Sequence, residues 1–169
     1  MNPINDDFLQ HLARCCCPGI SLSPEEDALP LLATGRARSD RPFVLFTPKL
    51  TLWTTNVSEY IYIFHVPELN FDTLAQCHRR ALDAGMSHFS PAARHRHTHI
   101  TTLILCDGAQ ADAMDALVPF KKQIGAALSP KARLTYRLAA IDLSSGEVAC
   151  NHRGRKLLAP LQRLAAPSA

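Results

Sequence analysis

Apolar residues in this chain fall into short runs that are typical of strands. The clearest run is Tyr60 to Val66, which is apolar at successive positions and so predicts a central strand that is buried on both faces. Arg133 to Ile141 instead alternates apolar and polar residues, as a half-exposed strand does. Four further strands are predicted at Phe43–Phe46, Thr51–Thr55, Thr98–Cys106 and Glu147–Cys150.

Helical patterns occupy both ends of the chain and the gaps between the later strands. Asn70 is placed to cap a helix with a 3.6-residue apolar period, which we expect Gly85 to end in the left-handed conformation. In the N-terminal part, a helix is predicted up to about Arg14, a second short helix begins at Ser23, and residues 35–42 are predicted to be a loop. Other helices are predicted from 109 to about 128, interrupted at Pro119, and after Asn151, interrupted at Pro160.

The order of these elements predicts an α/β fold that borders on the α+β class. Strands joined through a helix are usually parallel, and strands joined by a tight turn are antiparallel. We therefore expect a single domain with a mixed sheet of five or six strands, helices packed on it and a helical N-terminal lead. The lead and its loop cover residues 1–41, the mixed core covers 42–156, and a C-terminal helix with a frayed tail covers 157–169.

Composition places the chain among ordinary globular domains. It has 169 residues, of which 47% are hydrophobic and 20% charged, and it contains no apolar run long enough to span a bilayer. The six cysteines include three consecutive ones, Cys15 to Cys17, which do not form the spacing of a disulfide framework or of a paired metal motif. We therefore expect a soluble cytoplasmic protein without a membrane partner.

Positive charge is concentrated in the last third of the chain. The net charge is only +3, but residues 121–169 hold nine Lys or Arg residues against two acidic ones. The first 72 residues are net negative. This separation of charge suits either a surface for an anionic ligand or contacts between two copies of the chain. We therefore expect a small anionic ligand and a homo-oligomer, and nucleic acid remains among the candidate ligands.

The best candidate for anion binding is the basic segment at the start of the last helix. It consists of Asn151, His152, Arg153, Arg155 and Lys156. A capped helix start offers backbone amides, and guanidinium groups bind phosphate or carboxylate in a bidentate manner. The segment matches no known phosphate-binding motif, and a solvated helix start is the alternative interpretation.

A second candidate site lies where the expected parallel strands end. His65, Asp107 and Asp142 follow or close three such strands, whose carboxyl ends share one edge of the sheet. One imidazole and two carboxylates can hold a divalent metal or act as acid and base. Both aspartates also fit simple turns, which is the alternative.

A third candidate is the group His95, His97 and His99, which opens the strand ending at Cys106. Alternate residues of a strand share a face, so these imidazoles would lie on one side of the sheet. Their spacing of about 6 to 7 Å is too wide for all three to bind one zinc or nickel ion in a flat strand. The neighbouring Arg94 and Arg96 disfavour a cation and favour an anion or a solvated surface.

Three functions are consistent with these observations. The first is a binding or regulatory domain that recognises a small anionic or phosphorylated ligand. The second is a metal-dependent hydrolase that uses the histidine and aspartate residues, and the third is a scaffold or assembly subunit. No motif identifies a cofactor, and the sequence leaves open whether the protein is an enzyme.

Overall fold

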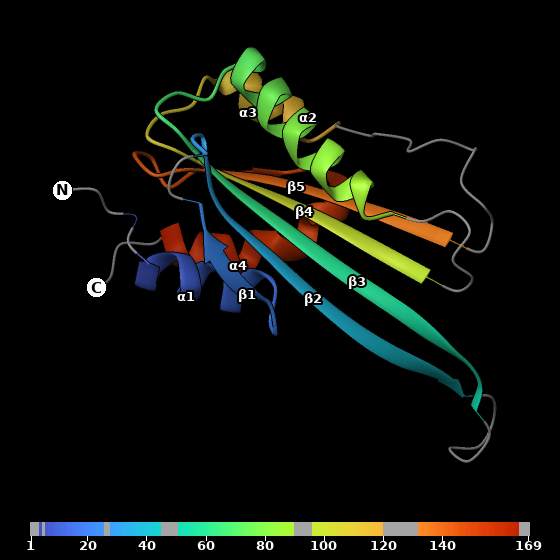
Figure 1. Cartoon of the computed structure of the whole chain (residues 1–169). Helices are drawn as coiled ribbons and strands as arrows, with labels where there is room; N and C mark the ends of the chain where they lie inside the picture. Colours follow the sequence, from blue (N-terminus) through green and yellow to red (C-terminus); the bar gives the residue numbers. More distant parts are fainter. Residues whose placement is uncertain are drawn as a thin grey trace.

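The computed structural model describes residues 4, 6–25, 28–44, 51–89, 96–119 and 132–165, and residues 40–44, 51–55, 96, 132 and 133 through their backbone only. Six strands form one sheet in the order β1-β2-β3-β4-β5-β6 (Figure 1). The elements are α1 (Asp6–Cys16), β1 (Ser21–Pro24), β2 (Leu31–Val44), β3 (Thr51–Val66), α2 (Phe71–Ser87), β4 (Arg96–Cys106), α3 (Ala111–Leu117), β5 (Ala132–Asp142), β6 (Val148–Cys150), a 3-10 turn (His152–Gly154) and α4 (Arg155–Ala165).

The sheet is mixed, as the order of elements predicts. Strands β3, β4 and β5 are parallel, whereas β1, β2 and β6 are antiparallel to their neighbours. The parallel pairs are those with an intervening helix, because a crossover must return the chain to the same end of the sheet. The predicted α/β fold with a mixed sheet of five or six strands is confirmed.

Helices cover the sheet on two faces and create two separate cores. On one face, Phe64 and Ile104 pack against α2 and α3. On the other, Ile63 and Leu103 pack beneath α1 and α4. Successive strand residues point to opposite faces, so Tyr60 to Val66 supplies both cores and is buried on both sides except at His65, as the sequence predicts.

The N-terminal third differs from the prediction. The helix at Ser23 and the loop at 35–42 are wrong, because these residues form β1 and most of β2. Strand β2 pairs with β3 from Leu31 to Val44, so partnership with a long strand overrides the turn-like local sequence. The strands expected at 43–46 and 51–55 belong, where described, to β2 and to one continuous β3.

Helix α2 begins as predicted but ends later. The Asn70 side chain accepts a hydrogen bond from the Thr73 amide at 3.0 Å, and Thr73 caps the Asn70 amide in return. Gly85 lies inside the helix, which is a correction, because the helix continues to Ser87. The glycine is needed there for packing, since a Cβ atom at this position would lie 2.7 Å from Cγ1 of Ile100.

The remaining helices partly match the prediction. Helix α3 ends at Leu117, and residues 120–131 of the predicted helical stretch lie outside the described residues. Pro160 lies inside α4 without ending it. In the part of the chain that the structure describes, no helix combines the length and the apolar character needed to cross a membrane.

Candidate functional site

The carboxyl ends of the parallel strands bring together two of the three residues expected there. His65 at the end of β3 and Asp107 after β4 lie 3.0 Å apart, from Nε2 to Oδ1. The His65 side chain is 19% exposed and that of Asp107 53% exposed, so the pair faces solvent. In open parallel sheets this edge is a common ligand-binding position.

Asp142 does not join this pair. It is in register with Cys106, whose side chain belongs to the core beneath α2 and α3, whereas His65 lies on the alternate face. Its Oδ1 accepts hydrogen bonds from the amide and hydroxyl of Ser144 and from the amide of Ser145. Burial raises the pKa of the Asp142 carboxyl, but these hydrogen bonds outweigh burial and leave the pKa below its ordinary value. Asp142 therefore fixes a turn.

The described histidines of β4 are not arranged as the ligands of a metal ion. His97 and His99 lie half-buried on one face of the strand, and His95 lies outside the described residues. Nη2 of Arg137 donates a hydrogen bond to Nδ1 of His99 at 3.1 Å. Among the described residues, no group of three or more His, Cys, Asp or Glu side chains is placed to hold a metal ion.

The basic segment at the start of α4 is largely a structural turn. The Asn151 side chain is buried, and its oxygen accepts hydrogen bonds from the amides of Leu138 and Gly154. His152, Arg153, Arg155 and Lys156 are exposed. Arg155 lines a groove of about 280 Å³ together with the acidic residues Asp115 and Glu147, which lower its attraction for an anion.

A second pocket of similar size lies on the α2 face of the sheet, between β1, β2, β3 and the end of α2. We call it the Tyr60 pocket, and its volume is about 310 Å³, at the lower end of the range for small-molecule sites. Its lining consists of Ser23, Thr34, Gly35, Arg36, Tyr60, Tyr62, Ala84, Ser87 and His88. The pocket thus joins residues that are up to 65 positions apart in the sequence.

The Tyr60 ring organises the polar end of this pocket. Arg36 on β2 is directly opposite Tyr60 on β3, and its guanidinium carbon lies 5.8 Å from the centre of the ring. His88, which caps the C-terminus of α2, stacks on the same ring with centroids 4.8 Å apart and planes within 7°. Contact with an aromatic ring restrains the guanidinium, so less conformational freedom remains to be lost on binding.

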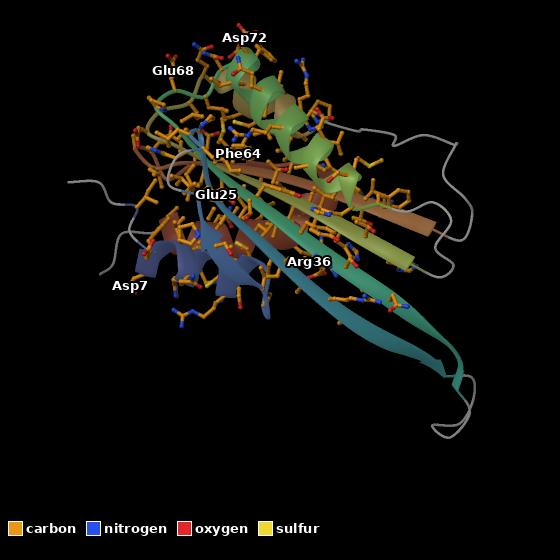
Figure 2. All side chains as sticks on the ribbon, viewed as in Figure 1. Asp7, Glu25, Arg36, Phe64, Glu68 and Asp72 are labelled. Carbon is orange, nitrogen blue, oxygen red and sulfur yellow. The ribbon has the colours of Figure 1, made fainter. Side chains whose placement is uncertain are left out.

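The rest of the lining consists of Tyr62, three hydroxyl-bearing residues and the small residues Gly35 and Ala84. Tyr62 is 6% exposed, and burial raises the pKa of its hydroxyl to about 12, so it stays protonated at neutral pH. The Thr34 hydroxyl donates to the Glu25 carboxylate at 3.1 Å beside the pocket. No carboxylate is among the described residues that line it, so Arg36 carries its charge without compensation inside the pocket. Figure 2 shows the Arg36 side chain on β2, well separated from Glu25.

Sequence reasoning missed the Tyr60 pocket for identifiable reasons. Arg36 fell in the predicted loop, and His88 lay beyond the predicted end of its helix. The usable signal was the pair Tyr60 and Tyr62, two aromatic residues with polar ends on one face of a strand. This pair of tyrosines indicates a pocket only when β2 is known to be the neighbouring strand.

Comparison with known proteins identifies a family and nothing more specific. The sequence profile of the family described as "Domain of unknown function (DUF8052)" matches residues 23–163, which is well over half of the chain. No curated protein matches the chain, and no solved structure matches it. Any functional assignment must therefore come from the residues themselves.

Proposed function

Because the chain belongs to this DUF8052 family, whose description carries no activity, we propose from its own residues that it is a binding domain for a small anionic ligand. The ligand occupies the Tyr60 pocket, with its carboxylate or phosphate on Arg36. The observation that carries the proposal is the position of an uncompensated guanidinium over an aromatic ring at the end of a formed pocket.

The lining also defines the rest of the ligand. Tyr60 and Tyr62 present aromatic surface, which suits a flat or apolar group, and the hydroxyls of Ser23 and Ser87 suit polar substituents. An anion of this kind pairs with a planar guanidinium through two parallel hydrogen bonds. The proposal thus keeps the ligand class expected from the sequence but places the site away from Arg153 and Arg155.

Charge balance favours this pocket over the start of α4. In the groove beside Arg155, Asp115 and Glu147 would repel an anion, whereas the described lining of the Tyr60 pocket holds no acidic residue. Both arginines are exposed, but the contact with the Tyr60 ring restrains Arg36, which therefore loses less conformational freedom on binding.

The proposal is tested by thermal stabilisation with a panel of anions at low salt. The panel contains inorganic phosphate, nucleoside monophosphates, aryl carboxylates and sugar phosphates, and binding raises the melting temperature of the wild-type protein. Arg36→Gln is expected to abolish the shift. The matched control is Arg38→Gln, which removes the same charge from the same face of β2 but outside the pocket, where Arg38 donates to Asn56.

Three results would overturn the proposal. The first is a wild-type protein that no anion of the panel stabilises. The second is a stabilisation that Arg36→Gln and Arg38→Gln reduce equally, because this would show a general effect of charge rather than a site. A shift that disappears only with Arg153→Gln and Arg155→Gln would return the site to the start of α4.

A further inference from the structure

The opposite face of the sheet, over which α1 and α4 lie (Figure 1), carries a second polar cluster. Its centre is a row across three parallel strands, in which Glu59 of β3 is in register with His99 of β4 and His99 with Thr135 of β5. Arg137 lies two residues further along β5 on the same face. The side chains of Glu59, His99 and Arg137 are half-buried, so the cluster is accessible without being fully solvated.

Arg137 is held in place without an acidic partner. Its Nη2 donates to Nδ1 of His99, and because a guanidinium only donates, the proton of the neutral imidazole is on Nε2. Among the described residues, Arg137 makes no ion pair with a carboxylate. A half-buried guanidinium of this kind is a strong site for an oxyanion.

Glu59 lies on the other side of His99 and also makes no ion pair among the described residues. Glu59 and Arg137 are two strands apart and are offset by two residues along the strand direction. Their Cα atoms are therefore about 12 Å apart. His99 therefore lies between the two charged residues on one face of the sheet. No ion pair joins Glu59 to Arg137 among the described residues, so both charges are available to a small molecule that carries the two opposite charges.

Cys17 and Thr101 close the inner end of this cluster. Both are nearly inaccessible, at 3% and 2% exposure. Burial raises the pKa of the Cys17 thiol to about 11, against the effect of the nearby Arg137 charge and of a hydrogen bond with Thr101, while Glu59 raises it further. Arg137 and Glu59 thus act electrostatically on the same thiol, which is neutral at pH 7.

We propose that this cluster is a second ligand site, which binds a small zwitterion of the amino-acid class. The carboxylate of the ligand pairs with Arg137, and its ammonium group pairs with Glu59. A simple anion fits less well, because the Glu59 carboxylate would repel it, and a simple cation would be repelled by Arg137. The site lies on the face opposite Arg36 and does not depend on the function proposed for the Tyr60 pocket.

Calorimetric titration of the full chain with free L-amino acids tests this site. We expect at least one of them to bind with a Kd below about 1 mM. The N-acetyl derivative of that amino acid, which lacks the ammonium charge, and its amide, which lacks the carboxylate, should each bind at least tenfold more weakly. These comparisons use the unaltered protein, so they do not depend on the folding of a variant.

The variants then locate the site. Glu59→Gln and Arg137→Gln should each weaken binding at least tenfold, with Arg153→Gln as the control for loss of an exposed positive charge. Arg36→Gln should leave the affinity unchanged, which separates this site from the Tyr60 pocket. The proposal is overturned if no amino acid binds, if the acetylated or amidated derivative binds equally well, or if binding survives in both cluster variants.

Discussion

Replacing Tyr136 by Phe tests the polar network inside the core beneath α2. The Tyr136 hydroxyl donates to Oγ1 of Thr102 at 3.1 Å, so it accepts the hydrogen bond from Nδ1 of His78 at 2.8 Å. All three residues are at most 9% exposed. Phe keeps the edge-to-face contact with the His78 ring, whose centroid lies 5.1 Å away, and therefore removes the hydrogen bonds without creating a large cavity.

The cost follows from the group that loses its partner. In Tyr136→Phe the Nδ1–H group of His78 loses its acceptor in the core, which costs about 1–3 kcal/mol. For a chain of this size, a loss of about 2 kcal/mol lowers the melting temperature by roughly 4–8 °C. Burial raises the pKa of the Tyr136 hydroxyl, so it remains protonated and a hydrogen-bond donor at neutral pH.

Urea unfolding followed by circular dichroism measures this cost. The matched control is Tyr62→Phe, a tyrosine of similar burial on the same sheet face, whose hydroxyl makes no hydrogen bond within the described part of the chain. We expect the control to change the free energy of unfolding by less than about 0.5 kcal/mol. If both variants lose the same amount, the hydrogen bonds of Tyr136 contribute nothing specific and the reasoning is refuted.

Three further predictions concern packing, the turn after β5 and the thiols. Gly85→Ala should destabilise the protein in thermal unfolding, although alanine is the better helix former, because its Cβ would overlap Ile100; a stabilised variant would show that the contact relaxes freely. The lowered pKa of Asp142 means that its charged form stabilises the fold above its unfolded pKa, and this stabilisation is lost as the pH falls through the folded pKa. The stability difference between wild type and Asp142→Asn should therefore shrink below about pH 4, and a difference independent of pH would contradict the assignment. Alkylation of the native protein at pH 8 should leave Cys17, Cys77, Cys106 and Cys150 unmodified by mass spectrometry, because they are buried; their rapid labelling would contradict the described core.

Much of the fold was predictable because the parallel strands carry their own signal. Tyr60 to Val66 is apolar at nearly every position, which only a strand covered on both faces requires, and the Asn70 cap marks the start of the following helix. The connection through a helix then implied parallel pairing with β4. These features are local in the sequence, so they can be recognised without knowing which strands are neighbours.

Strand β2 was not predictable in the same way. Its residues from Gly35 to Pro42 are small, charged or unable to donate, which is typical of a loop. They form a strand because β3 pairs with all of them, and Pro42 is tolerated because β1 extends along β2 only as far as Arg36. Because Arg36 is the charged residue of the Tyr60 pocket, a prediction without this strand could not identify the site.

The candidate sites were predicted only as far as strand ends determine them. His65 and Asp107 were expected to be neighbours and lie 3.0 Å apart, because parallel strands end at one edge. The cluster of Glu59 and Arg137 depends on which residues are in register across three strands, and register is set by tertiary packing that the sequence alone does not specify.

The central claim, that the protein binds a small anion in the Tyr60 pocket, is tested most directly by nuclear magnetic resonance. An amide spectrum of the uniformly labelled protein is recorded while the most stabilising anion of the panel is added at low salt. We predict that the largest changes occur at Gly35, Arg36, Tyr62 and His88, which surround the pocket on three elements. Changes confined to residues 152–156 at the start of α4, with none around Tyr60, would contradict the claim.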